Sequence, residues 1–137
     1  MQGTVRALFI APEKKATSVS VPSVQTTSGG FDGDYHALKA NGRQVLMVSS
    51  SILEQLELEP GAISENIVLD GIDVMSLCEG QQLRLGQAIL EVTGPCEPCG
   101  QMDRIRSGLK KALSHRRGMF AKVVRSGEIR VGDVVEY

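Results

Sequence analysis

The chain has 137 residues, which is the length of one domain, so we expect a single domain over residues 1–137. Its 42% hydrophobic and 23% charged residues are typical of a globular protein and exclude a disordered or fibrous one, and the 4% aromatic content without Trp predicts an aliphatic core. No apolar run approaches the roughly 18 residues of a membrane span and no secretory leader pattern is visible, so we expect a cytoplasmic protein with no membrane partner.

The net charge of −1 conceals a strong segregation of charge along the chain. Residues 44–98 contain nine acidic residues and one basic residue, a net charge of −8, whereas residues 103–127 carry a net charge of +7. This basic segment is either a solvated face or an anion site. Because its single aromatic residue is Phe120, it lacks the stacking side chains of proteins that read single strands or RNA. We therefore expect a small phosphorylated ligand and no nucleic acid.

In the first half of the chain, short apolar runs alternate with glycine and proline, which is a pattern typical of β-structure. Ser51 and Glu54 form a capping-box pattern at the start of a short helix, which we expect to end near Pro60. The other elements predicted here are strands at residues 4–11 and 19–24 around a turn at 12–15, a glycine-rich loop at 28–33, and a buried strand at 44–49.

The second half of the chain continues this β-type pattern and adds one helical pattern. Ile105, Leu109 and Leu113 recur every four residues and predict one long helix, which Gly108 weakens by roughly 1 kcal/mol relative to Ala. We also predict a strand at 66–69, a hairpin at 82–92 bent at Gly86, a loop at 96–100, and strands at 119–125, 128–131 and 134–137. Because closure of a sheet removes its exposed edges, the predicted fold is mainly β: a small closed or partly closed β-barrel with a few short helices.

The most informative chemistry is the Cys-x-x-Cys pair of Cys96 and Cys99, in a loop bounded by glycine and proline. Half of a zinc site is one interpretation, but Cys78, His36 or His115 would have to complete the ligands. A dithiol redox pair is a second, although the chain shows no βαβ pattern to support it, and two buried thiols acting as small hydrophobes is a third. We favour a single presented thiolate near the basic segment, suited to soft metals or sulfur chemistry.

A series of short pieces, consistent in order and spacing, resembles the MOSC domain, which is named for the C-terminal domain of molybdenum-cofactor sulfurases. One departure is Ser64, which stands where many members carry glycine in a Gly-Glu-Asn motif. The matching pieces span nearly the whole chain: Asp32-Gly33-Asp34-Tyr35-His36, Arg43-Gln44-Val45, Pro60-Gly61, Glu65-Asn66-Ile67, Leu77 with Gly80 and Gly86, Pro98-Cys99, Gly118, Gly127 and Gly132-Asp133.

The resemblance implies a β-barrel domain with a functional cysteine that handles sulfur or ligates molybdenum in a pterin cofactor, molybdopterin. Larger relatives include sulfurases, whose separate pyridoxal-phosphate domain makes persulfide, and reductases of N-hydroxylated compounds. Cys99 matches the family cysteine, and Cys96 is an additional thiol. No pyridoxal-phosphate domain fits in 137 residues, so we expect no pyridoxal phosphate in this chain.

The charged site residues follow from this resemblance and from the chemistry of the side chains. Cys99 is the expected catalytic residue and metal ligand, or the acceptor of sulfur. The cofactor phosphate needs basic partners, for which we expect Lys15, Arg43 and part of the basic segment at 104–117, including Arg104.

Three polar side chains complete the predicted cofactor site. Asn66 could donate an amide hydrogen bond to the pterin or phosphate, or instead cap a turn. Ser49 could donate its hydroxyl in the same way. His36 could orient a ligand or carry a proton near neutral pH, or instead hold the glycine-rich loop through a structural hydrogen bond.

Two functions of different classes remain open from the sequence. In the first, the protein is a small reductase whose bound molybdenum performs the chemistry. In the second, it is a non-catalytic carrier that accepts persulfide sulfur on Cys99 from a donor such as a cysteine desulfurase and delivers it to a molybdoenzyme. A sensor or storage module for the cofactor is a third alternative. All three need one presented thiol and an anion site, so the sequence does not separate them.

Overall fold

The computed structural model describes residues 2–13, 17–38 and 44–137. Within these ranges the strands are β1 (Gln2–Ile10), β2 (Val19–Val21), β3 (Ser23–Thr27), β4 (Gly30–Phe31), β5 (Val45–Ser49), β6 (Ile67–Asp70), β7 (Gln82–Leu85), β8 (Ala88–Pro95), β9 (Met119–Arg125), β10 (Glu128–Arg130) and β11 (Val134–Glu136). The helices are α1 (Ser50–Gln55), α2 (Gln101–Ile105) and α3 (Leu109–Ala112), with 3-10 turns η1 (Tyr35–Leu38) and η2 (Val74–Ser76). No helix of the described residues is long and apolar enough to cross a membrane.

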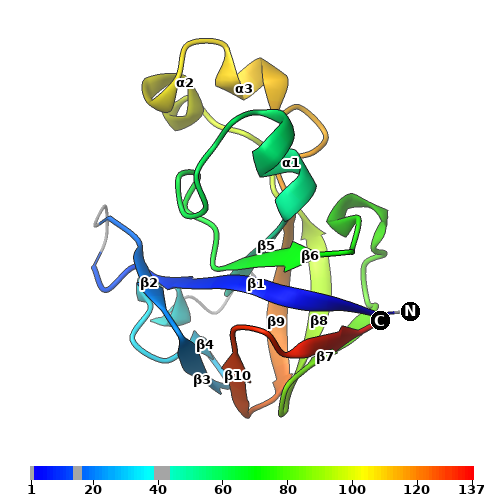
Figure 1. The fold of residues 1–137 in the computed structure, drawn as a ribbon. Helices are drawn as coiled ribbons and strands as arrows, with labels where there is room; N and C mark the ends of the chain where they lie inside the picture. The colour runs from blue at the N-terminus through cyan, green and yellow to red at the C-terminus, as the bar shows by residue number, and fades with distance from the viewer. Residues whose placement is uncertain (1, 14–16, 39–43) are drawn as a thin grey trace.

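The main sheet closes on itself as a barrel, which confirms the predicted fold class. Its strands follow the order β11-β7-β8-β9-β5-β6-β1, and pairing of β1 with β11 closes the ring. β5 and β6 are parallel, whereas the other neighbours in the ring are antiparallel. β2 extends the sheet beyond β1, and β10, β3 and β4 form a small second sheet. The three α-helices lie together at one end of the barrel (Figure 1).

Two apolar clusters lie on the two faces of the β5–β6 pair. Val45 and Met47 belong to the cluster inside the barrel, whereas Leu46 and Val48 belong to a second cluster that includes residues of all three α-helices. All five residues of β5 are therefore buried, as expected for a strand covered on both faces. The second cluster is aliphatic apart from two phenylalanines and a cysteine, and it connects the helical end to the barrel wall.

The predicted long helix after the cysteine loop is wrong, because the chain forms two short helices instead. α2 ends where Arg106 has an extended conformation, and Gly108 precedes α3 with φ of 83°, a left-handed conformation that glycine adopts readily. Leu109 and Leu113 are buried as expected, but Ile105 is 44% exposed. The apolar residues at four-residue spacing therefore belong to two separate helices, Ile105 to α2 and Leu109 to α3.

The predicted capping box is also absent from the first helix. α1 begins at Ser50, so Ser51 lies inside it, and the residue at the capping position is Ser49, which makes no capping bond. The Ser49 hydroxyl is already engaged, because it donates to the Ile72 carbonyl at 2.8 Å and accepts from the Val74 amide at 2.8 Å. The helix ends at Gln55, earlier than the predicted Pro60, and a turn continues the chain.

The strand predicted over residues 19–24 is divided at Pro22. β2 pairs with β1 before this proline, and β3 pairs with β10 after it. Proline carries no amide hydrogen and interrupts a ladder, so the chain passes here from one sheet to another. The hairpin of β7 and β8 bent at Gly86 is confirmed.

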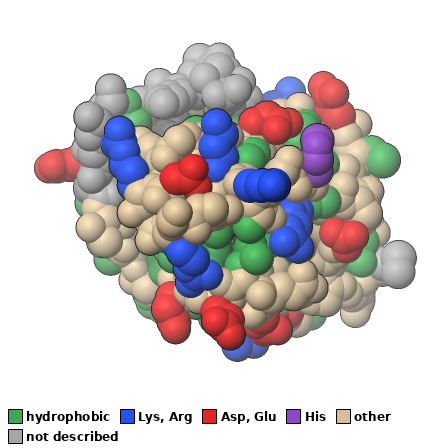
Figure 2. Space-filling model, turned by 90° about the horizontal axis from the view of Figure 1, so that it is seen from above, with side chains coloured by type: hydrophobic (Ala, Val, Ile, Leu, Met, Phe, Trp, Pro, Cys, Tyr) green, Lys and Arg blue, Asp and Glu red, His purple; other side chains and the backbone are tan. Residues whose placement is uncertain are grey.

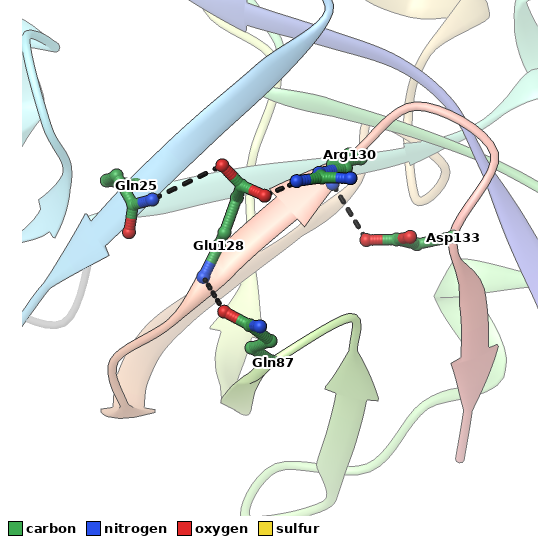
Figure 3. Close-up of polar contacts among 5 residues, drawn as sticks. All are labelled: Gln25, Gln87, Glu128, Arg130 and Asp133. Carbon is green, nitrogen blue, oxygen red and sulfur yellow. Dashed lines mark hydrogen bonds and ion pairs between the residues drawn. The ribbon is translucent and has the colours of Figure 1, made fainter.

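A polar cluster joins the second sheet to the turn between β7 and β8. The Glu128 carboxylate accepts from Gln25 Nε2 at 3.3 Å and from Arg130 Nε, and the Glu128 amide donates to Gln87 Oε1 at 3.4 Å. Asp133 accepts from the Arg130 amide at 2.8 Å. Figure 3 shows these five residues, which come from segments far apart in the sequence and join the parts of the fold at this place. We refer to them below as the Glu128 cluster.

Candidate functional site

The loop that carries the two cysteines connects the end of β8 to α2. The Cys96 amide donates to the Gly118 carbonyl at 2.9 Å, and the Met102 amide donates to the Cys99 carbonyl at 3.0 Å. These bonds tie the loop to the start of β9 on one side and to α2 on the other, and they confirm the predicted loop at 96–100. Cys96 is partly buried against the second apolar cluster, Cys99 is exposed, and neither forms a disulfide in the described structure.

Both thiols line one cavity of about 330 Å³, which we call the thiol cavity. Its walls come from β5, from the turn before β6, from the cysteine loop and α2, and from the start of β9. The lining residues are Leu46, Ser64, Asn66, Cys96, Glu97, Cys99, Gln101, Arg117 and Phe120. Segments separated by more than fifty positions in the sequence therefore meet at this site.

Arg117 is the cationic side chain among the described residues that line the thiol cavity, which also include the acidic Glu97, and Arg117 is 5% exposed. Its Nη2 donates to the Ile63 carbonyl, whereas its Nη1 is buried and has no hydrogen-bond partner among the described residues. An unpaired buried donor on a charged group costs several times the net worth of an ordinary hydrogen bond, so native proteins rarely leave one without a reason. An anionic or strongly accepting ligand in the cavity would satisfy it.

Electrostatics around Arg117 favour negative charge in the same place. Burial lowers the pKa of Arg117 from its ordinary value, and the negative charges of Cys96, Glu65 and Cys99 oppose that effect. Guanidinium groups keep their proton in proteins, so the cavity holds a permanent positive charge. The thiolate forms of both cysteines interact favourably with this charge.

Glu65 balances Arg117 from the interior of the turn before β6, and it is completely buried. Its carboxylate accepts from the Gly61 amide at 2.8 Å and from the Ile63 amide at 3.3 Å. Burial raises the pKa of Glu65, whereas these amide bonds and the charge of Arg117 act in the opposite direction. Glu65 thus shapes the turn that also presents the Ile63 carbonyl to Arg117.

Gly118 allows Arg117 to reach this position. Its φ is 140°, and a Cβ atom there would lie 2.5 Å from the Met47 carbonyl oxygen of β5. A larger residue would push the start of β9 away from β5 and displace its neighbour Arg117. Ser64, also in the cavity wall, has φ of 64°, which is a left-handed conformation that glycine adopts without strain.

The structure brings only part of the predicted site together. Asn66 lines the thiol cavity beside Cys99, but its amide also links two strands, because Oδ1 accepts from the Leu46 amide at 3.0 Å and Nδ2 donates to the Phe9 carbonyl at 3.2 Å. One Nδ2 hydrogen remains for a ligand. Ser49 is not among the residues that line the cavity, and its hydroxyl serves the turn after β6.

Arg104 lies in a neighbouring groove of about 530 Å³ that shares Ser64 and Gln101 with the thiol cavity. We call it the adjoining groove; Thr17, Ser18 and residues of α2 complete its walls. Lys15 and Arg43 lie outside the described residues. His36 belongs to η1, but its side chain is outside the described part of the structure.

The basic segment is not one continuous anion site. Arg106 donates to the carbonyls of Leu56 and Glu57, which directly follow α1 in the sequence. Arg116 donates to the Ala112 carbonyl at 2.7 Å and to Gln55 Oε1 at 3.3 Å. The end of the barrel with the helices carries several basic side chains around a central area of apolar ones (Figure 2). Among the basic residues of this segment, Arg117 lines the thiol cavity and Arg104 lines the adjoining groove.

The described residues contain no group of three or more His, Cys, Asp or Glu side chains placed to hold a metal ion. Cys78 and His115, two of the three residues that could complete the ligands in the zinc interpretation, are exposed and do not line the thiol cavity. Arg117 and Glu65 are the site residues that the sequence did not single out. Glu65 appeared only as part of the family resemblance, and nothing local distinguishes Arg117 from the adjacent Arg116.

Comparisons with known proteins agree with this architecture. The sequence profile of the MOSC domain matches residues 32–136. The crystal structure of the YuaD protein from Bacillus subtilis superposes with a TM-score of 0.85 at 23% identity, covering 98% of this chain and 94% of that protein.

Two further crystal structures share the fold at lower identity. YiiM from Geobacillus stearothermophilus superposes with a TM-score of 0.77 at 19% identity, covering 96% of this chain and 72% of that one. YiiM from Escherichia coli superposes with a TM-score of 0.74 at 18% identity, covering 99% and 69%. No curated protein matches this chain in sequence. Because the family profile covers more than half of its residues, the chain belongs to the MOSC domain family.

Proposed function

We propose that this protein binds a molybdenum–pterin cofactor in the thiol cavity and the adjoining groove, with Cys99 as the thiolate that ligates molybdenum or accepts sulfur. The observation that carries the proposal is the buried Nη1 of Arg117, which has no partner among the described residues and belongs to the same cavity as the two cysteines Cys96 and Cys99. A soft donor and an unsatisfied cationic donor side by side suit a ligand that has both a thiophilic metal and anionic oxygens.

The residues present fit such a group. Cys99 would provide the thiolate, Arg117 would bind an anionic oxygen or sulfur of the metal centre, and Asn66 would offer its remaining amide hydrogen. Arg104 in the adjoining groove would neutralise the phosphate of the pterin. The cavity and the groove lie in the size range of small-molecule sites in proteins. When bound, the molybdenum centre would supply the redox chemistry of a reductase, and the chain would position it.

A second candidate function is a persulfide carrier, in which Cys99 accepts sulfur from a donor protein such as a cysteine desulfurase and passes it to a molybdoenzyme. The exposure of Cys99 supports it, because a thiol must be reached by another protein to exchange sulfur with it. The charge of Arg117 would favour the anionic persulfide in the same way that it would favour a metal-bound anion.

Element analysis of the purified protein tests the proposal. The wild type, Cys99→Ser and Cys78→Ser would be purified in parallel from a molybdenum-replete host, and molybdenum and phosphorus measured per chain. We expect both elements in the wild type and in Cys78→Ser, whose cysteine lies outside the cavity, and loss of both in Cys99→Ser. Wild-type protein that is free of molybdenum, and that does not take up the isolated cofactor, would contradict cofactor binding and leave the carrier function.

A further inference from the structure

We propose that Cys96 is a resolving thiol, which discharges sulfane sulfur from Cys99 as hydrogen sulfide and forms a disulfide with it. The inference rests on the proposed role of Cys99 as the working thiol, and it assigns an activity to the second cysteine. Sulfur delivered to this protein would then leave in reduced form, and the chain would return to its starting state by reaction with a dithiol reductant.

The first support is the placement of the two thiols. Cys96 and Cys99 are separated by two residues and line the same cavity of about 330 Å³. A sulfur atom added to one cysteine would therefore lie in the cavity that the other cysteine also lines. The third cysteine of the chain, Cys78, does not line this cavity. Neither cysteine forms a disulfide in the described structure, and the backbone of the loop between them is anchored at its two ends by the bonds of the Cys96 amide and the Cys99 carbonyl.

The second support is the difference in exposure between the thiols. Cys99 is exposed and can meet an external donor, whereas Cys96 is partly buried against the second apolar cluster. A bulky donor therefore has access to Cys99, while Cys96 is accessible to a group already placed on Cys99. This is the arrangement expected of an acceptor thiol and a resolving thiol.

The third support is the shared charge of Arg117. This guanidinium interacts favourably with the negative charge of both cysteines, and its Nη1 is buried without a partner among the residues that the structure describes. A positive charge that reaches both sulfurs stabilises the attacking thiolate as well as the hydrosulfide that leaves.

The two steps balance in atoms and electrons. The Cys99 thiolate attacks the outer sulfur of a persulfide donor, the sulfur–sulfur bond of the donor breaks, the donor leaves as its thiolate, and Cys99 becomes a persulfide. The Cys96 thiolate then attacks the inner sulfur of this persulfide, the outer sulfur leaves as hydrosulfide, and a Cys96–Cys99 disulfide forms. The two cysteine sulfurs are oxidised by two electrons, and the sulfane sulfur is reduced by two. A dithiol reductant reverses the oxidation of the cysteines.

A single-turnover experiment with inorganic polysulfide tests this proposal. Reduced wild-type protein, Cys96→Ser and the matched control Cys78→Ser would be treated briefly, desalted, and followed by sulfide release and by intact mass. We expect the wild type and Cys78→Ser to release about one sulfide per chain and to lose the mass of two hydrogens. Cys96→Ser should instead retain the mass of one added sulfur, with sulfide release slower by more than about tenfold because the intramolecular thiol is gone.

The outcomes separate the resolving role from the role of Cys99. Stable retention of sulfur by the wild type, equal to that of Cys96→Ser, would overturn the resolving role and leave Cys99 as an acceptor. Absence of added sulfur from Cys99 in every variant would overturn both. Circular dichroism and thermal melting of Cys96→Ser would show that the variant is folded, and peptide mapping of the wild-type product for the Cys96–Cys99 disulfide provides a readout that needs no substitution.

Discussion

The thiol cavity and the Glu128 cluster differ in how completely their buried or partly buried charged side chains are hydrogen-bonded. In the Glu128 cluster, the carboxylate of Glu128 accepts from two side chains, and the neighbouring amides have side-chain acceptors of their own. In the thiol cavity, Arg117 is nearly completely buried and one of its nitrogens has no partner among the described residues. The first arrangement is complete without a ligand and joins the sheets, whereas the second is completed only by something that enters it.

The comparison also shows that polarity alone does not indicate function. The Glu128 cluster is held by several side-chain hydrogen bonds, and its residues lie in β3, in β10 and in the turns beside them. What distinguishes the thiol cavity is an unmet hydrogen-bonding capacity beside two nucleophiles. The following predictions test whether the two regions differ in the way that this contrast requires.

The largest expected effect is on stability when Glu65 is replaced. Glu65→Ala removes the acceptor of the Gly61 and Ile63 amides and the carboxylate that balances Arg117, so a buried cation is left uncompensated. We expect a loss of about 3–5 kcal/mol in the free energy of unfolding, measured with urea. Glu128→Ala is the matched control and should cost about 1 kcal/mol, because its partners can turn to water. Equal losses at the two positions would remove the contrast between the regions.

The next effect is on ligand affinity when the unpaired donor is removed. Arg117→Met should weaken binding of the pterin cofactor by more than tenfold, since a hydrogen bond to a charged group is worth about 1.5–3 kcal/mol. Titration of apo protein at two salt concentrations measures it, and the buried contact should depend little on salt. A Lys110→Ala/Lys111→Ala double variant, with both side chains exposed and outside the cavity, should change affinity by less than about twofold.

A smaller effect is the dependence of stability on pH. Burial raises the pKa of Glu65 in the folded protein, so the folded state binds its proton more readily than the unfolded state does. Its contribution to stability is therefore most favourable below the ordinary glutamate pKa of about 4.3 and falls as the pH rises through the folded value. Relative to Glu65→Gln, which cannot titrate, the wild type should lose up to about 1.4 kcal/mol per pH unit over this interval.

Urea unfolding at a series of pH values measures this difference directly. Parallel curves for the wild type and Glu65→Gln would mean that burial does not oppose ionisation of Glu65.

The smallest effect concerns the backbone of the turn before β6. Ser64 has a left-handed conformation that costs a serine roughly 1 kcal/mol more than a glycine, although glycine also gains freedom in the unfolded chain. We expect Ser64→Gly to change the free energy of unfolding by no more than about 1 kcal/mol and to leave cofactor affinity within twofold. A large loss of affinity would instead assign the Ser64 hydroxyl to the ligand.

The sequence by itself determined the features that depend on local pattern. The barrel, the buried strand β5, the hairpin bent at Gly86 and the cysteine loop all follow from alternation of apolar residues and from the backbone limits of glycine and proline. The same local rules failed where two helices shared one pattern, as at Ile105 and Leu109, or where a tertiary partner bonded a side chain, as at Ser49.

The tertiary structure alone decided which charged residue belongs to the site. Arg116 and Arg117 are adjacent and chemically identical, yet Arg116 bonds to Ala112 and Gln55 while Arg117 is buried beside Cys96 and Cys99. Adjacent side chains point in different directions, so they contact different parts of the fold. Arg117 contacts the turn that contains Glu65, more than fifty positions away in the sequence, and the pairing of β5 with β6 and β9 brings the two segments together. Burial and unmet hydrogen bonds arise only when such distant segments close around a side chain, because both are properties of the assembled surroundings rather than of the residue.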